Sequence, residues 1–500
     1  MTSAEHLGQC DEAANAKLDA LPNQPAEDRQ LMNGRSLIQF GDICQLPPPG
    51  GVSVMYDAAR ILNEPGLPPE NRQTTASPGS NTAVRRAHGL DVWRASTDVF
   101  FLEGQERFLP TGDGQRLQQA VQLYGTIQVD KTQPGAVQEE QRIRLRDNIA
   151  TLVDTLNRQI ADFALPPGST LYPERRRLVT PRNQGRHELN LRLAARDPAR
   201  GNQRIIAWNA VDHAVIGRRQ PTVPLTGALA ILAKQQAPDN VKDIAPTTYY
   251  YEGILYTLLD NTATGAGRRR NTEATGRGII LDPREPPDRN PSSPIRHLQY
   301  PPAIVFVEPA DTQLGNRLNA RLPPTMQLPP NTIALVPGFT SAGSLRLPEP
   351  VQLPGASQPC EQLSIKRYGI PVGSAYAVTD FFVEGCTIAN QWWALELTPP
   401  PWGRGTGTHV SGRSLYVCLS RFTRFSDVRL LRPLYTHGNA EQREHIIQKF
   451  TDAAIMSNDL QAEILRLRQL ATATQARHQN LFRRAEEMHR LIHQHTGKKI

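Results

Sequence analysis

Apolar residues recur every three or four positions in several stretches of this chain, the spacing that places them on one face of an α-helix. One such stretch predicts a short helix with a buried face that ends at Ser420 and Arg421. Longer stretches predict further helices over residues 115–126, 139–163, 440–456 and 458–495. The last helix could pair in a short coiled coil or pack on the core, and its spacing fits both.

Short apolar runs bounded by glycine, proline and polar residues predict strands. Outside residues 249–363, such runs lie at 37–40, 99–102, 178–180, 204–208, 374–379 and 428–431. Between 249 and 363 the strands are separated by loops rich in Pro, Gly and Arg, a pattern that suits a small β-barrel better than a parallel sheet. The strands predicted there cover 253–259, 276–282, 303–307 and 332–336.

The composition is that of a protein with sizeable cores and no membrane span. The chain has 500 residues, a formal charge of +8 and 39% hydrophobic residues, without the run of about 18 apolar residues that a span needs. Its first residues have neither a signal core nor a transit helix. Five cysteines without paired spacing favour a reducing compartment, nuclear or cytoplasmic. Arginine clusters at 175–177 and 268–270 could contact phosphates, and solvated loops explain them equally well.

Arg421 is the first candidate functional residue. A helix that ends in an arginine just before a strand can hold a permanently charged, bidentate donor at the mouth of a cleft where phosphate is bound. Arg421 occupies that position, ahead of the apolar run at 428–431. The simpler alternative is an ordinary surface arginine.

A second candidate stretch follows the buried strand predicted at 37–40. Gly41 and Asp42 end that strand, and Gln45 then lies in a loop fixed by three consecutive prolines. A polar side chain at the carboxyl end of a strand is where an α/β sheet places ligand contacts. The alternative is a proline-rich loop without a ligand.

Both stretches resemble motifs of superfamily-one DNA helicases of the petite-integration-frequency (Pif) and Helitron type. The Arg421 stretch resembles the sixth motif, a helix reading roughly Tyr-Val-Ala-Leu-Ser-Arg that ends in an arginine finger. The Gln45 stretch resembles the third motif, approximately Gly-Asp-Phe-x-Gln-Leu-Pro-Pro-Val. The resemblance implies nucleotide contacts at Gly41, Asp42, Gln45 and Arg421 and DNA contacts at Pro47 and Pro48.

Arg107 belongs to a third stretch with this resemblance. The family carries a strand followed by approximately Leu-x-Glu-x-Met-Arg, whose arginine also touches the terminal phosphate of ATP. The apolar run at 99–102 and Arg107 match, whereas Glu106 stands where methionine is common. The resemblance therefore implies a third contact with the terminal phosphate, from Arg107.

Residues 178–190 resemble the family's Thr-x-Arg-Asn…Leu-Asn segment, which opens its second RecA-like domain. A strand, a turn and a helix start are predicted, and a polar side chain in the turn can cap the helix and leave amides for a phosphate. The resemblance implies DNA contacts at Thr180, Arg182 and Asn183.

Residues 374–387 resemble the fifth motif, approximately Ala-Tyr-Ala-Ile-Thr-x-His-Lys-Ser-Gln-Gly-x-Thr. Thr379 and Gly385 match, but Phe382 replaces the lysine and Glu384 the glutamine. These changes make the segment less attractive to phosphate, although phenylalanine can stack on bases with about 1–3 kcal/mol per base. We favour degeneration of the motif over replacement of its chemistry. The resemblance implies nucleotide contacts at Glu384 and Gly385 and DNA contacts at Thr379, Phe381 and Phe382.

Two motor motifs are missing from these 500 residues. ATP hydrolysis in this family needs a Gly-Lys-Ser/Thr loop that cradles the phosphates and an Asp-Glu pair that holds magnesium, and the sequence contains neither. Residues 1–7 resemble the helix that follows the Asp-Glu motif, so we expect the chain to begin just past it. ATP and Mg²⁺ are implied by family resemblance, and neither is secure for this chain alone.

The predicted fold class is α/β, a RecA-like P-loop NTPase helicase core with a small SH3-like β insertion and a helical tail. Residues 1–135 are assigned to the rear of the first RecA-like domain and 136–245 with 364–435 to the second. Residues 246–363 are assigned to the insertion, which contacts DNA in the family, and 436–500 to the C-terminal helical extension.

The resemblance predicts an ATP-dependent DNA helicase whose partner is single-stranded or forked DNA, with no membrane partner. We expect this chain to be a truncated or decayed copy that neither binds ATP tightly nor unwinds DNA by itself. One alternative is a non-enzymatic single-stranded nucleic-acid-binding protein that kept the DNA groove. Another is a structural protein that acts through its C-terminal helices, with self-association through 458–495.

Overall fold

The computed structural model describes the greater part of the chain in detail. The described residues are 81–101, 107–161, 177–180, 186–259, 271–353, 358–398 and 411–481, with short gaps in the longer ranges, and scattered positions near both ends, among them 37–39, 41, 42, 44 and 45. They form two compact units. The first takes Met1–Thr155, His409–Phe425 and Tyr435–Ile500, and the second takes Leu156–Thr408 and Ser426–Leu434.

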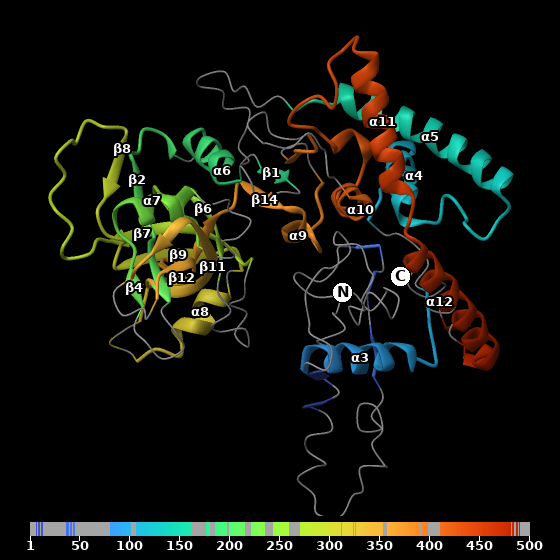
Figure 1. Cartoon of the computed structure of the whole chain (residues 1–500), viewed down its shortest axis with the longest axis horizontal. Coiled ribbons are helices and arrows are strands. Elements are labelled where there is room, and N and C mark those ends of the chain that lie inside the picture. The colour runs from blue at the N-terminus through green and yellow to red at the C-terminus, as the bar shows by residue number, and fades with distance from the viewer. Residues whose placement is uncertain are drawn as a thin grey trace, which may run out of the picture. The chain divides into compact units, whose positions relative to one another are not determined.

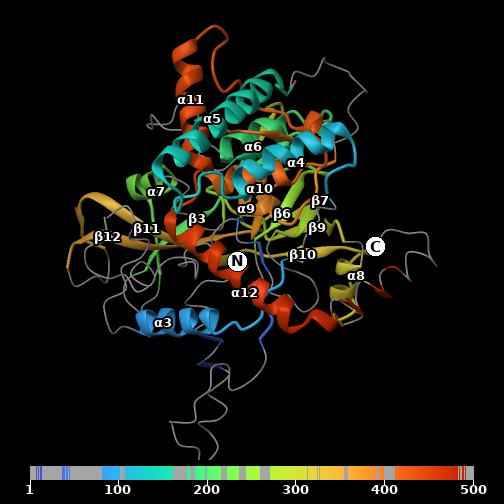
Figure 2. The ribbon, with the colours of Figure 1, turned by 90° about the vertical axis from the view of Figure 1, so that its right-hand side faces the viewer.

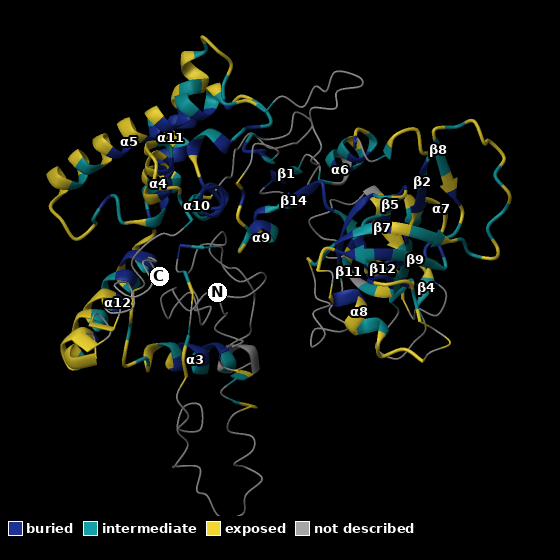
Figure 3. Ribbon diagram, turned by 180° about the vertical axis from the view of Figure 1, so that it is seen from behind, coloured by how far each residue is buried: buried dark blue, intermediate teal, exposed yellow. Residues whose placement is uncertain are grey.

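Helices build the described part of the first unit. They are α3 Asn81–Arg94, α4 Gly112–Gly125, α5 Gly135–Arg158, α10 Gly412–Ser420, α11 Ala440–Ala454 and α12 Asn458–Arg477. Each helix predicted from apolar spacing is present, and the helix predicted over 458–495 ends its regular course at Arg477. Helices α4, α10 and α11 lie together (Figure 1), and α10 is buried over most of its length (Figure 3).

Two glycines allow α10 to pack this closely. A Cβ at Gly412 would lie 1.9 Å from the carbonyl oxygen of Ala453 in α11, and one at Gly125 would lie 2.7 Å from the ring of Tyr416. Only a residue without a side chain fits at such separations. The N-terminus of α10 is capped by Ser411, whose hydroxyl accepts a hydrogen bond from the backbone N–H of Ser414 at 3.1 Å.

Helix α12 packs on the core of the first unit along its first turns. Leu460 and Ile464 belong to one cluster of buried side chains with Leu90 and Met456. Packing on the core, one of the two alternatives for this helix, is therefore confirmed for these turns. Self-association stays a prediction.

The second unit contains a three-stranded parallel sheet. Strand β1 Arg177–Thr180 lies between β14 Ala377–Thr379 and β15 Trp393–Leu395, and both pairings are parallel. Helix α6 Arg186–Ala195 is fixed to this sheet because the side-chain amide of Asn190 exchanges two hydrogen bonds with the backbone of Ala377, at 2.8 and 2.9 Å. The predicted α/β class, with a parallel sheet and helices, is confirmed.

Three further sheets share the second unit. A five-stranded antiparallel sheet has the order β10 Ile333–Leu335, β9 Ile304–Pro309, β7 Glu273–Ile280, β6 Leu255–Leu258 and β13 Val372–Ser374. It contains all the strands predicted between 249 and 363. Within the described part of the chain, its end strands β10 and β13 do not pair with each other. The sheet is therefore open, and the expected barrel is not formed. Helix α8 Leu314–Asn319 lies against β9 and β10.

A four-stranded antiparallel sheet has the order β11 Gly338–Val351, β12 Cys360–Gly369, β3 Val211–Val215 and β4 Val223–Pro224. Helix α7 Gly227–Gln235 covers one face of it (Figure 2), where Ala233 packs against Leu345 and Leu363. The last sheet has the order β5 Thr247–Tyr250, β2 Ile205–Asn209 and β8 Ile295–Leu298. Strand β2, predicted over 204–208 as the next strand after β1, thus joins a separate sheet.

Several predicted strands are wrong. Residues 37–39 and 99–101 are not strands, and Ile38 and Phe100 are 74% and 59% exposed instead of buried. The run at 428–431 makes only isolated bridges at Leu430. The 409–425 segment groups with the first 155 residues because α10 packs on α4 and α11, and the assigned domain bounds stay a prediction.

Candidate functional site

The turn at Asp42 is closed by the Asp42 side chain. Its Oδ1 accepts a hydrogen bond from the backbone N–H of Cys44 at 2.9 Å, and the backbone N–H of Gln45 donates to Asp42 O at 3.2 Å. The side-chain amide of Gln45 also donates to Asp42 Oδ2, at 3.4 Å. Asp42 therefore fixes both the turn and the direction of Gln45, while Gly41 before it is exposed.

Cys44 anchors this turn to the end of helix α4. Its thiol is buried and donates to the carbonyl oxygen of Gly125 across 3.3 Å. Burial is the main reason that the pKa of Cys44 is raised to about 12, with a smaller contribution from Asp42. The thiol is thus protonated at neutral pH and serves as a donor.

Helix α10 reaches the same turn through Tyr416. The Tyr416 hydroxyl donates to Asp42 Oδ2 at 2.7 Å. The pKa of Tyr416 is raised well above its ordinary value, first by burial and then by the neighbouring charge of Asp42. A carboxylate that accepts hydrogen bonds from both Tyr416 and Gln45 joins the turn to α10.

Arg107 contacts the other end of α10. Its Nη1 donates to the carbonyl oxygen of Ser420 at 2.7 Å. Two residues later, the backbone N–H of Leu109 donates to the carbonyl oxygen of Thr423 at 2.9 Å. The segment around Arg107 is therefore held beside the end of α10 by two hydrogen bonds.

Arg421 is folded back onto its own helix. Its Nε donates to the carbonyl oxygen of Val417 at 3.1 Å, and its Nη2 donates to Ser420 Oγ at 2.8 Å. The residue is 2% exposed. These local hydrogen bonds hold the guanidinium against α10 in this conformation. The alternative of an ordinary surface arginine is therefore wrong, whereas the role of Arg421 as a donor to phosphate stays a prediction.

Helix α10 also brings a second arginine close to the Asp42 turn. The charge of Arg413 is near enough to Cys44 to oppose the rise in the pKa of that thiol. Among the described residues, neither Nη1 of Arg413 nor the hydroxyl of Tyr124 in α4 has a hydrogen-bond partner, and both atoms are buried. The resemblance gave no role to Arg413 or to Tyr416, because the only residue of this motif to which it gave a role was Arg421, the C-cap of α10.

The first unit thus collects predicted site residues from three distant segments. Hydrogen bonds place them along α10: Asp42 with Gln45 beside Tyr416, Arg107 beside Ser420, and Arg421 at the C-terminal end of the helix. Their roles toward a nucleotide stay predictions. Pro47 and Pro48 lie outside the described residues.

The second unit carries predicted DNA contacts at one end of its parallel sheet. Thr180 and Thr379 are directly paired at the carboxyl ends of β1 and β14. The short helix α9 Asp380–Val383 follows, with Phe381 39% exposed and Phe382 half-buried. The carboxyl ends of parallel strands are where an α/β sheet places ligand contacts, and the DNA contacts of these residues stay predictions. Arg182 and Asn183 lie outside the described residues.

Gly385 and Glu384 end this segment. Gly385 has a φ of +91°, which favours glycine, and Glu384 is the half-buried C-cap of α9. The fold alone assigns no nucleotide contact to Glu384 or Gly385, so their nucleotide-binding roles stay predictions. Within the described part of the chain, no group of His, Cys, Asp or Glu side chains could hold a metal ion. None of the described helices is long and apolar enough to cross a membrane.

No protein-family model matches the chain, and no curated protein matches it in sequence. Solved structures of Pif1 helicases are similar to it in fold. Bacteroides Pif1 bound to single-stranded DNA has a TM-score of 0.44 at 12% sequence identity, and the match covers 87% of this chain and 69% of the Pif1 chain. The same helicase with ADP-AlF3 and single-stranded DNA has a TM-score of 0.43 at 12% identity, over 92% and 74%.

Pif1 helicase from Candida albicans has a TM-score of 0.39 at 13% identity, over 90% of this chain and 74% of that one. All these TM-scores are below 0.5, so the likeness by itself assigns no site or activity. It names the same family whose motifs the sequence resembles.

Proposed function

We propose that this chain acts in a Pif1-like DNA helicase, with the Asp42 turn, Arg107 and Arg421 on the terminal-phosphate side of a nucleotide. One observation carries the proposal. The three segments that resemble motifs touching that phosphate are far apart in sequence, and they meet along helix α10.

The chemistry of the cluster suits phosphate binding. Arginine binds phosphate with two parallel hydrogen bonds, and an arginine placed on a transferring phosphoryl group accelerates the reaction by about 10³- to 10⁵-fold. To make such a contact, Arg421 must leave Val417 O and Ser420 Oγ. Because the guanidinium is charged, each such hydrogen bond contributes about 1.5–3 kcal/mol net, which contact with a phosphate would offset. Ligand binding would therefore reorient Arg421.

Hydrolysis also needs a phosphate cradle and magnesium ligands. The 500 residues contain no Gly-Lys-Ser/Thr sequence. We therefore expect DNA binding from this chain by itself and no ATP turnover above a blank. ATP, Mg²⁺ and a nuclear compartment belong to the proposal only through the family resemblance.

The experiment that tests the proposal measures nucleotide and DNA binding on the whole chain. Fluorescence anisotropy should detect a labelled oligo-dT that binds more weakly as salt rises, with a slope of about −0.7 per phosphate contacted. ATP turnover abolished by Arg421→Ala would contradict the expected inactivity and identify a working motor. Absence of single-stranded DNA binding even at low salt would overturn the proposal.

A second candidate function, a non-enzymatic single-stranded nucleic-acid-binding protein, is favoured by helix α9. Phe381 is exposed and Phe382 is half-buried in a segment whose family counterpart carries a lysine. Phe381→Ala separates the two functions when it is compared with Arg421→Ala. A purely binding protein loses DNA affinity with the first change and nothing measurable with the second, whereas under the first proposal the second change also weakens nucleotide binding.

A further inference from the structure

The four-stranded sheet has one face without a covering helix among the described residues. Along β12 the residues alternate: Leu363, Ile365 and Arg367 are buried, while Ser364 and Lys366 between them are exposed. Helix α7 covers the buried face. The opposite face therefore points its side chains away from the core.

Three aromatic rings gather on that outward face. Phe339 of β11 is directly paired with Tyr368 of β12, and their ring centroids are 5.0 Å apart. The His213 ring of β3 lies edge-on to Phe339, also at 5.0 Å between centroids. Phe339 is nevertheless 52% exposed. A large aromatic side chain that neighbours hold in place and solvent still reaches is a ready surface for another flat ring.

Positive charge accompanies the rings. Lys366 is exposed and directly paired with His213 across the strands. Arg284 lies 4.5 Å over the Tyr300 ring, with 69% of its side chain exposed. The hydrogen bond to Asp282 is the main reason that the pKa of Arg284 is raised, and Tyr368 adds to the rise, which puts Tyr368 within electrostatic reach of Arg284.

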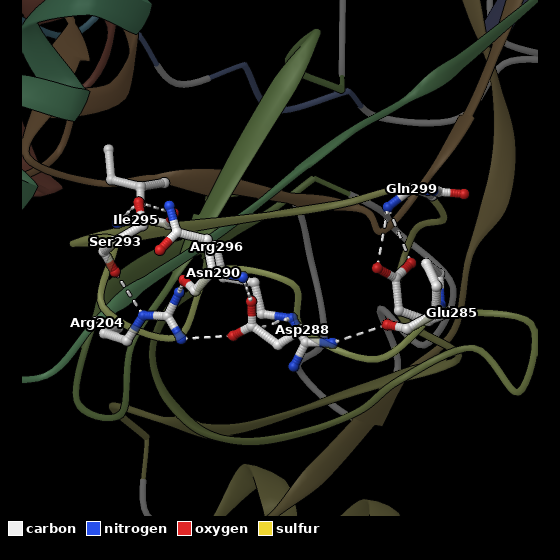
Figure 4. Close-up of polar contacts among 9 residues, drawn as sticks. Arg204, Glu285, Asp288, Asn290, Ser293, Ile295, Arg296 and Gln299 are labelled. Carbon is white, nitrogen blue, oxygen red and sulfur yellow. Dashed lines mark hydrogen bonds and ion pairs between the residues drawn. The ribbon is translucent and has the colours of Figure 1, made fainter.

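The loop that presents Arg284 and Tyr300 is ordered by hydrogen bonds (Figure 4). Arg204 donates to Asp288 Oδ2 at 2.6 Å and to the carbonyl oxygens of Ser293 and Asn290 at 2.6 and 2.9 Å. The carboxylate of Glu285 accepts a hydrogen bond from the backbone N–H of Gln299 at 2.9 Å (Figure 4). It also accepts one from the backbone N–H of Tyr300 at 3.0 Å. Arg284 is thus displayed on a fixed loop.

Within the described part of the chain, the nearby carboxylates leave Lys366 as the cation of this surface without an ion pair. Asp212 is buried on the other side of the sheet in an ion pair with Arg367. Asp282 forms an ion pair with Arg284 and offsets its charge, and the carboxylate of Glu285 accepts hydrogen bonds from backbone amides. Lys366 has no ion pair among the described side chains, so its charge can attract a phosphate that lies beside the rings.

We propose that His213, Phe339, Lys366, Tyr368, Arg284 and Tyr300 form a second nucleic-acid surface, the aromatic–basic face, on which bases of a single strand stack. Exposed rings on a four-stranded sheet can stack bases in this way, with cations on the adjacent phosphates. A duplex hides the faces of its bases, so a single strand fits better. The choice of this partner rests on the proposed function. The surface adds to that function a second binding site, which lies outside the helicase-like motifs.

Binding of oligo-dT and oligo-rU by the whole chain tests this surface. The double variant Phe339→Ala with Tyr368→Ala should weaken binding by about 5- to 100-fold, the range of a lost base–aromatic stack. Lys366→Glu should make the salt dependence less steep, by about one phosphate contact. Ile231→Ala is the matched control for lost apolar area, because Ile231 is 58% exposed on α7, across the sheet. Arg321→Glu is the control for charge reversal at an exposed cation.

Cross-linking gives an independent readout. An oligonucleotide that carries 5-iodouracil should form an ultraviolet adduct with Phe339, Tyr368 or Tyr300 of the wild-type chain, located by mass spectrometry. Unchanged affinity in the double variant with no adduct on these rings overturns the inference, even if the chain binds DNA elsewhere. Failure of the wild-type chain to bind either oligonucleotide overturns the proposed function as well. Tighter binding of oligo-rU than of oligo-dT identifies RNA as the bound strand. Equal binding of the two oligonucleotides indicates that the surface contacts only bases and phosphates.

Discussion

The hydroxyl of Tyr416 joins helix α10 to the Asp42 turn across 374 positions of sequence. Tyr416→Phe removes that hydroxyl and keeps the ring that packs against Gly125. A hydrogen bond to a charged group contributes about 1.5–3 kcal/mol. Because Asp42 keeps its hydrogen bonds from Cys44 and Gln45, we expect a loss near the lower end, about 1.5–2 kcal/mol, which is about a 10- to 30-fold rise in opening of the turn.

Cys44 reports this opening directly. While the turn is closed, its thiol is buried and its pKa is about 12, so the reactive thiolate is scarce. Opening returns the pKa to about 8.5, and labelling by N-ethylmaleimide then follows the open fraction. Below that pH the labelling rate should rise about tenfold per pH unit in both proteins, and their ratio should stay constant. Peptide mapping separates Cys44 from the other four cysteines.

Tyr435→Phe is the matched control. The Tyr435 hydroxyl also donates to an aspartate of the same unit, Asp154, at 2.8 Å, far along the chain from the turn. The Tyr435→Phe substitution should leave the rate of Cys44 labelling unchanged. Equal labelling in wild type and Tyr416→Phe, or equal acceleration by both variants, would refute the role of Tyr416 as the link.

Two further substitutions test the packing that supports these surfaces. Arg367→Met leaves Asp212 buried without its partner, so the second unit should lose about 3–5 kcal/mol, measured by hydrogen exchange of the β12 amides. The half-exposed Arg317 is its control, since Arg317→Met should cost below about 1 kcal/mol. Gly412→Ala would place a methyl group 1.9 Å from Ala453 O. It should destabilise the first unit by about 1–3 kcal/mol, measured by exchange of the α11 amides, and unchanged exchange would show that the helices can separate at little cost.

The elements that the sequence predicted well are those whose signal is local. Helix α10 follows from its apolar spacing, and its cap Ser411 is a typical N-cap residue. Although β8 and β11, in the same part of the chain, are not among the predicted strands, β6, β7, β9 and β10 follow from turn residues that bound short apolar runs. Such features depend on neighbours a few positions away, so the sequence alone determines them.

The predictions that failed depend on contacts between residues far apart in the sequence. A strand at 37–40 would depend on pairing with a segment distant in sequence, which apolar spacing does not reveal, and Ile38 is exposed. The pairing of β2 with β5 and β8 rather than β1 depends on tertiary context. In the candidate site, motif order identified Gln45, Arg107 and Arg421, but the contact of Tyr416 with Asp42 joins residues that no local pattern relates.

The burial of Arg421 changes how the candidate site should work. Val417 O and Ser420 Oγ hold its guanidinium, and the carbonyl of the same Ser420 accepts a hydrogen bond from Arg107. A ligand that draws Arg421 outward therefore disturbs the residue that also positions Arg107. At the other end of the same helix, Tyr416 holds the Asp42 turn. Under the proposed function, α10 is thus the element through which a terminal phosphate would couple both arginines to the turn, so Tyr416→Phe should weaken that coupling even though Tyr416 itself touches no phosphate.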